Sequence, residues 1–84
     1  MTDKINMYGC LIEAQYLQRI ATKCVVFIEQ DPFECSVNVT IVSELGDIFI
    51  YKFRCSSSSM ENADELQILK EKFYQLNGEE DYNE

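Results

Sequence analysis

Four cysteines and fifteen acidic residues are the side chains of this 84-residue chain that could take part in chemistry. The cysteines stand at positions 10, 24, 35 and 55, and no pair has the C-x-x-C spacing of a redox motif or a zinc knuckle. The chain contains no His, which excludes the Ser–His and Cys–His nucleophile systems. Its three glycines are isolated, so no phosphate-binding loop is present. We therefore expect no enzyme activity, no cofactor and no metal.

The cysteines are expected to be free thiols that behave as small buried hydrophobes. The first residues lack the basic segment and long apolar core of a secretory signal, which favours a reducing, cytoplasmic location. The longest apolar run, 24–28, is far shorter than the ~20 residues that span a bilayer, so no membrane association is expected. Cys35 is in phase with Val37 and Val39, which points to burial. A thiol-based redox sensor built from these cysteines remains the alternative.

The net charge of −8 is unevenly distributed. Residues 61–84 carry eight acids and two bases, a net charge of −6, whereas the first sixty residues carry only −2. Such a charge opposes direct binding of nucleic acid, which needs phosphate neutralisation. It favours a protein partner with a basic surface.

The hydrophobic pattern predicts a helix, three strands and a second helix. Residues 8–22 place Cys10, Ala14 and Leu17 on one helical face, although partial alternation leaves a strand as the alternative there. Residues 24–28 are β-branched and aromatic, and residues 35–42 and 48–54 alternate as half-buried strands do. The connections at 30–34 and 43–47 are short, which makes the strands sequential and antiparallel.

The last helix has an apolar stripe of Leu66, Leu69, Phe73 and Leu76. Its predicted start is a capping box over residues 62–65, with Ser58 and Glu61 as the alternative. Asn77 and Gly78 form the predicted stop, so that residues 1–78 make one domain and residues 79–84 a flexible acidic tail.

The predicted fold class is α+β, a two-layer sandwich of a three-stranded antiparallel sheet with an N-terminal and a C-terminal helix. This order is similar to that of double-stranded-RNA-binding domains. That family requires basic residues at the start of its last helix, where this chain has Asp64 and Glu65. Lys52 and Arg54 form the only basic cluster, so we do not expect RNA binding.

The candidate sites are apolar or acidic residues on the outer sides of the two helices, because contiguous exposed apolar patches tend to bind partners. The predicted partner-binding residues are Asp64, Glu65, Ile68, Glu71, Glu79, Glu80, Asp81 and Tyr82. The predicted oligomer-interface residues are Ile12, Tyr16 and Ile20.

Two functions remain open. The first is a small acidic inhibitor that engages a basic, nucleic-acid-binding surface of a partner protein. Immunity proteins, antitoxins and phage-encoded inhibitors that mimic nucleic acid have this size and charge, which is an analogy of class only. The second is a structural subunit or homodimer assembled through the N-terminal helix.

Overall fold

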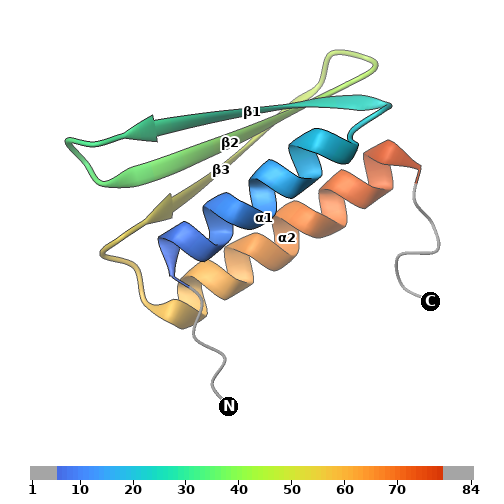
Figure 1. Ribbon diagram of the computed structural model, residues 1–84. Helices are drawn as coiled ribbons and strands as arrows, with labels where there is room; N and C mark the ends of the chain where they lie inside the picture. Colours follow the sequence, from blue (N-terminus) through green and yellow to red (C-terminus); the bar gives the residue numbers. More distant parts are fainter. Residues whose placement is uncertain (1–5, 79–84) are drawn as a thin grey trace.

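The computed structural model describes residues 6–78, which form two helices and three strands (Figure 1). In chain order these elements are α1 (Met7–Ile20), β1 (Cys24–Asp31), β2 (Ser36–Ser43), β3 (Ile48–Arg54) and α2 (Ser59–Asn77). The predicted α-β-β-β-α order and the antiparallel three-stranded sheet are confirmed. The first element is a helix and not the alternative strand. The predicted tail, 79–84, lies outside the described residues.

The sheet is a meander in which each strand pairs with its neighbour in the chain, in the order β1-β2-β3. Its register places Val39 of β2 opposite Ile28 of β1 and Tyr51 of β3. The turn between β1 and β2 is held by Asp31, whose Oδ1 accepts the backbone N–H groups of Phe33 and Glu34 at 3.0 and 3.2 Å. An Asp carboxylate commonly fixes a turn in this way.

Side-chain caps define where the helices begin. Asn6 caps α1 by accepting the N–H of Gly9 at 2.9 Å. Ser58 caps α2 in a reciprocal box with Glu61, which satisfies two backbone donors that the first turn leaves free. The predicted box over residues 62–65 is therefore wrong, because Asn62 lies one turn inside the helix and is buried. The predicted stop is confirmed, since Gly78 ends α2 with a φ of +79°.

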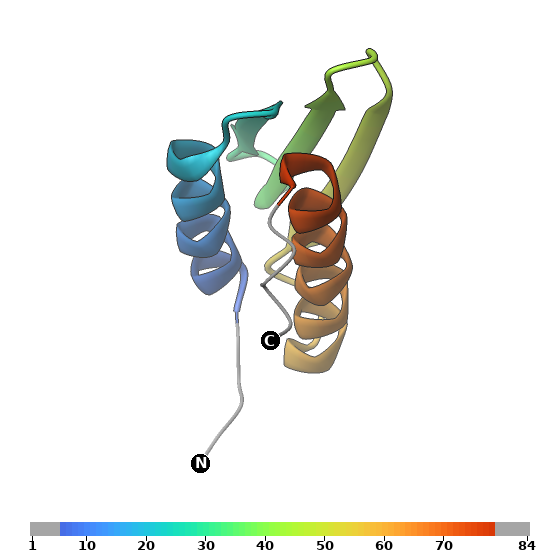
Figure 2. The ribbon, with the colours of Figure 1, turned by 90° about the vertical axis from the view of Figure 1, so that its right-hand side faces the viewer.

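Both helices pack on the same face of the sheet (Figures 1 and 2). The strands turn alternate side chains toward this helical layer, as the two-residue period of a strand requires. The largest fully buried side chains are Phe53, Phe73, Leu17, Ile41 and Leu69, which come from both helices and two strands. The predicted stripe of α2 is thus in the core, although Leu76 is only partly buried.

Two buried asparagines hold α2 against the rest of the chain. Asn77 lies at its C-terminal end, where Oδ1 accepts the N–H groups of Thr22 and Lys23 at 2.8 and 2.9 Å. These are the residues that connect α1 to β1. Near the other end, Nδ2 of Asn62 donates to the backbone oxygen of Arg54 at the end of β3, at 3.4 Å. These contacts tie one end of α2 to the α1–β1 connection and the other end to β3.

Replacing Asn77 with Ala should destabilise the protein, because two backbone N–H groups would lose their common acceptor. Both hydrogen bonds are partly buried, and each contributes about 0.5–1.5 kcal/mol, so we expect a loss of about 1–3 kcal/mol from a total near 5–10 kcal/mol. Urea denaturation of Asn77→Ala, with the exposed Gln75→Ala on the same turn as control, measures the effect. A difference below about 0.5 kcal/mol between the two variants would contradict the assigned role of Asn77.

Candidate functional site

The face of the sheet that points away from the helices is uncovered, and we call it the open face. It consists of four cross-strand rows of side chains, each with one residue from β1, β2 and β3. In order along the strands these rows are Val25–Val42–Ile48, Phe27–Thr40–Ile50, Glu29–Asn38–Lys52 and Asp31–Ser36–Arg54.

The first two rows make an apolar half of the open face. Val25, Phe27, Ile48 and Ile50 are all more than half exposed, from 51% to 66% of their surface. Val42 lies between Val25 and Ile48 and is partly exposed. Opposed side chains on one face of a sheet are neighbours, so these residues form a contiguous patch. Contiguous exposed apolar patches of small domains are candidates for interaction surfaces.

The other two rows make a polar half in which the charges are separated by strand. Glu29 and Asp31 lie on β1, and Lys52 and Arg54 lie on β3. The intervening β2 keeps the two columns about 10 Å apart, which is twice the spacing between strands. Lys52 instead bonds to Glu34 of the β1–β2 turn, with 3.2 Å between Nζ and Oε1.

The sequences of β1 and β3 indicate the open face, whereas the alternating sequence of β2 does not. β2 alternates apolar and polar residues, which is typical of a half-wet strand. β1 and β3, in contrast, carry large apolar residues in both phases, Val25 and Phe27 as well as Val26 and Ile28 in β1. A strand that is apolar on both sides normally has both sides covered. Within residues 6–78 nothing covers the second side.

The second candidate surface is the solvent-facing ridge of α2, which contains several of the predicted partner-binding residues. Asp64 and Glu71 are exposed, and Ile68 is 51% exposed between them. Glu65 is half-buried on a different side of the helix, where its charge adds to burial in raising the pKa of Tyr51. The remaining predicted residues, Glu79, Glu80, Asp81 and Tyr82, lie outside the described residues.

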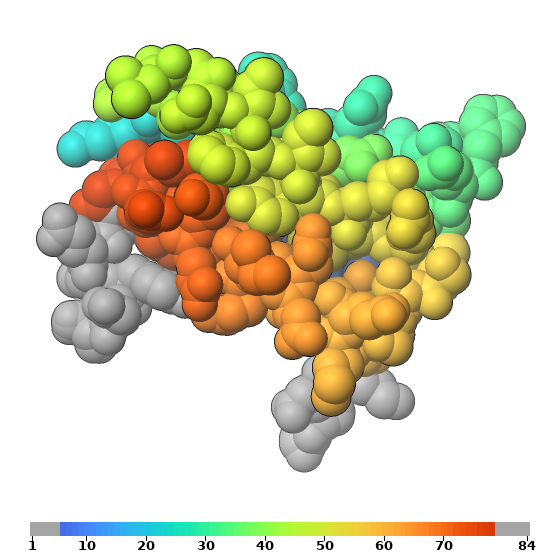
Figure 3. Space-filling model, turned by 180° about the vertical axis from the view of Figure 1, so that it is seen from behind, coloured from blue at the N-terminus to red at the C-terminus, as the bar shows by residue number. Residues whose placement is uncertain are grey.

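The two lysines of α2 are turned away from this ridge. Lys70 reaches toward α1, where its Nζ lies 3.8 Å from Oε1 of Glu13. Lys72 reaches toward β3 and lies 4.5 Å from the centre of the Phe49 ring, a cation–π contact. The face of the molecule on which α2 and β3 lie side by side is shown in Figure 3. The ridge of Asp64, Ile68 and Glu71 is consequently acidic, with an apolar residue at its centre.

The predicted oligomer-interface residues on α1 differ in how far they are exposed to solvent. Ile12 and Tyr16 are exposed, at 65% and 48%, and Tyr8 continues the same side at 57%. Ile20 is only partly exposed and packs against the core. The outer side of α1 therefore offers an aromatic and aliphatic stripe of Tyr8, Ile12 and Tyr16, which excludes Ile20.

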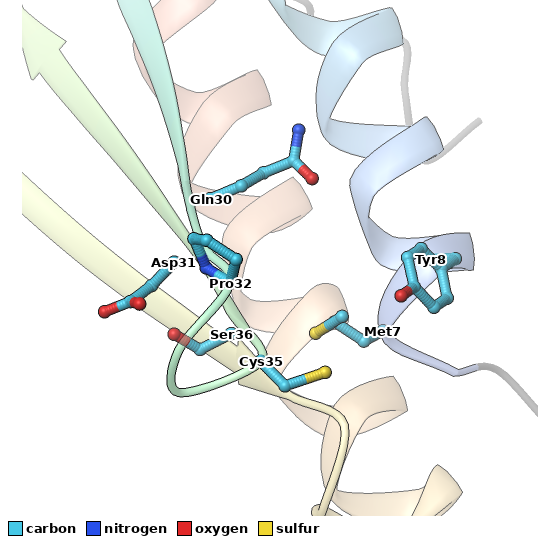
Figure 4. Close-up of a pocket in the computed structure, with 7 residues that line it drawn as sticks. All are labelled: Met7, Tyr8, Gln30, Asp31, Pro32, Cys35 and Ser36. Carbon is cyan, nitrogen blue, oxygen red and sulfur yellow. The ribbon is translucent and has the colours of Figure 1, made fainter.

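A pocket of about 370 Å³ lies between the start of α1 and the β1–β2 turn (Figure 4). It is lined by Met7, Tyr8, Gln30, Asp31, Pro32, Cys35 and Ser36. Two of its polar groups have partners: Asp31 accepts two turn N–H groups, and Ser36 Oγ lies 3.4 Å from Oε1 of Glu34. Cys35 contributes a free thiol to the same lining.

The four cysteines fall into two classes, and none is in a disulfide. Cys10 and Cys24 are buried as predicted, whereas Cys35 is half-buried and Cys55 is exposed. Burial raises the pKa of the Cys10 thiol to about 11, with a smaller contribution from the carboxylate of Glu13. Burial also raises the pKa of Cys24. Both thiols are therefore inert at neutral pH.

Across residues 6–78, no group of three or more His, Cys, Asp or Glu side chains is arranged to hold a metal ion. Neither helix in this part of the chain has the length and apolar character needed to cross a membrane. Comparison of the chain with protein-family models, with curated proteins and with solved structures gives no match.

The raised pKa of Cys10 makes the stability of the protein sensitive to alkaline pH. The folded state keeps this proton up to about pH 11, whereas the unfolded thiol loses it near its ordinary pKa of 9.0. The free energy of unfolding should therefore fall as pH rises through this window, by about 1 kcal/mol between about pH 8 and pH 10. Cys10→Ala should lose this part of the pH dependence in urea denaturation, and the parent protein should show it. Equal slopes in the two proteins would contradict the assignment.

Proposed function

We propose that the protein is a non-enzymatic protein-binding module that associates with a second copy of itself through the open face. One observation carries the proposal: the open face is complementary to itself. Its apolar half is contiguous, and its acidic and basic columns lie on opposite edge strands. A two-fold symmetric interface requires such self-complementarity, since the same patch serves both subunits.

The two-fold axis that satisfies the pattern runs parallel to the strands, along β2. This axis places β1 of one copy over β3 of the other. Each cross-strand row of the open face then meets the same row of the second copy. Phe27 then faces the second copy's Ile50, and Val25 faces its Ile48. Glu29 faces Lys52, and Asp31 faces Arg54, so every row meets a row of matching chemistry.

A two-fold axis that runs across the strands, in the plane between the two sheets, does not bring rows of matching chemistry together. It reverses the order of the rows, so that full overlap sets the apolar half of one copy against the charged half of the other. Burying unpaired charges against apolar side chains is costly. The charge pattern therefore selects one of the two arrangements.

The open face is small, which sets the expected affinity. Three strands of about seven residues cover a flat area of roughly 14 by 24 Å. This is below the ~800 Å² per partner of a standard interface, so we expect a dimer with a Kd in the micromolar range. Packing of two sheets in this way buries an apolar layer about 10 Å thick.

A pair of matched substitutions separates the open face from the outer side of α1. Ile50 and Ile12 are almost equally exposed, at 66% and 65%, and lie on the two candidate interfaces. We expect Ile50→Glu to be monomeric at concentrations where the parent protein is a dimer, because it buries a charge among apolar side chains. Ile12→Glu should remain a dimer. Sedimentation equilibrium from about 1 to 500 µM measures both.

Three results of that experiment would overturn the proposal: a parent protein that stays monomeric throughout the range, a dimer lost only in Ile12→Glu, or a dimer that both variants retain. The direction of the axis has its own test. In a Glu34→Gln background, which frees Lys52 from its intrachain partner, Glu29→Lys should weaken the dimer and the added Lys52→Glu should restore it. If adding Lys52→Glu to Glu29→Lys weakened the dimer further, the axis parallel to the strands would be excluded.

The ridge of α2 supports a second function, binding of a protein with a basic surface. The observation that favours it is that both lysines of α2 are engaged by neighbouring elements, so that within residues 6–78 neither Asp64 nor Glu71 is in an ion pair. An apolar anchor within a charged rim is a common arrangement of a binding hot spot. The helices lie opposite the open face, so a dimer would present this ridge twice.

Selection of a random peptide library on the immobilised protein tests the ridge. We expect enrichment of peptides that combine Lys or Arg with an apolar residue. Their affinity for the Asp64→Lys, Glu71→Lys variant should be at least about tenfold lower, since two attractive contacts become repulsive. Glu44→Lys, an exposed acid of the β2–β3 loop, is the control. Equal binding to both variants would remove the ridge from consideration.

A further inference from the structure

Cys35 and Cys55 lie side by side although they are twenty residues apart in the sequence. Cys35 directly precedes β2, and Cys55 directly follows β3. Ser36 is paired with Arg54, so one further step along the two strands brings Cys35 opposite Cys55. The backbone confirms this step, because the N–H of Cys55 donates to the backbone oxygen of Cys35 at 3.0 Å.

The geometry of this pair suits a disulfide. Cys35 itself precedes β2 and has a φ of +55°, but the hydrogen bond from Cys55 holds the two backbones together as in an antiparallel pair, whose Cα atoms are about 5.5 Å apart. Disulfides span Cα separations of about 4.4–6.8 Å, which includes this spacing. The neighbouring Cys55 thiol, more than burial, raises the pKa of Cys35.

We propose that Cys35 and Cys55 are a redox-active pair that forms a reversible intramolecular disulfide with a small disulfide such as oxidised glutathione as the oxidant. The pair lies outside the open face: Cys35 is in phase with the inward-facing Val37, and its side chain points toward Met7 of α1 (Figure 4). The proposal is therefore independent of self-association.

The reaction is a double thiol–disulfide exchange. The exposed Cys55, as the thiolate, attacks one sulfur of oxidised glutathione, which forms a mixed disulfide and releases one glutathione thiolate. Cys35, as the thiolate, then attacks the Cys55 sulfur, which forms the Cys35–Cys55 bond and releases the second glutathione thiolate. The protein loses two electrons and two protons in total, and glutathione disulfide is reduced to two thiols.

The other two cysteines are not able to replace either partner. Cys10 and Cys24 are buried, and their sulfurs lie 3.8 Å from the backbone oxygen of Asn62 and 3.9 Å from Oδ1 of Asn77. These two partners are near opposite ends of α2, about 20 Å apart along the helix axis. Oxidation should accordingly consume two thiols and leave two.

The full chain is treated with excess oxidised glutathione, alkylated with N-ethylmaleimide under denaturing conditions and weighed by mass spectrometry. We expect two alkylated cysteines, compared with four in the reduced protein, and a cross-link between peptides that contain Cys35 and Cys55. Cleavage after Glu34 separates Cys35 from Cys24 for this assignment. The oxidised protein should melt about 10 °C higher, because the bond closes a loop between two paired strands, and dithiothreitol should reverse the shift.

Variants distinguish the pair from unspecific oxidation. Cys35→Ser should stop at the mixed disulfide and carry one glutathione on Cys55, and Cys24→Ala should form the disulfide as the parent does. The proposal is overturned if the parent protein also stops at the mixed disulfide, if the cross-link joins other cysteines, or if the disulfide links two chains.

Discussion

The carboxamide of Asn77 joins the end of α2 to the connection between α1 and β1. It lies on the last turn of α2 and accepts two backbone N–H groups of the α1–β1 connection, 54 and 55 residues earlier. This contact aligns the end of α1 with the end of α2, and Asn62 aligns the start of α2 with the end of β3. Both helices are thereby committed to the same side of the sheet. The uncovered second side, and every binding surface discussed above, follows from that arrangement.

The two proposed functions rest on different layers of the molecule. The open face of the sheet presents an apolar half and two pairs of opposite charges. This pattern suits association with a second copy of the protein. The helical layer carries the acidic ridge, which suits a basic partner. In the proposed dimer the sheets meet at the centre and the helices lie outside. The two functions expected from the sequence, assembly and binding of a basic protein, then use different surfaces of one particle.

The fold could be predicted from local patterns, but the candidate surfaces depend on contacts that are distant in sequence. The alternation of β2 and the stripe of Leu66, Leu69 and Phe73 each reflect burial on one side, and both are visible in the sequence. Asn62 resembles a helix cap in the sequence because Asn favours caps, whereas its tertiary contact with Arg54 places it inside the helix. The open face and the Cys35–Cys55 pair require the register between strands. A single sequence does not supply this register, because a slip by one residue reverses every side chain.

The meander order of the sheet has a consequence for the route by which the chain folds. Each strand pairs with the next one through a connection of four residues, so both hairpins can close with little loss of chain entropy. The contact between Asn77 and the α1–β1 connection closes a loop of more than fifty residues and has far more entropy to overcome. Mixed domains with many local contacts fold quickly. We therefore expect the sheet to form early and the final turn of α2 to dock late, so that substitutions of Asn77 accelerate unfolding more than they slow folding.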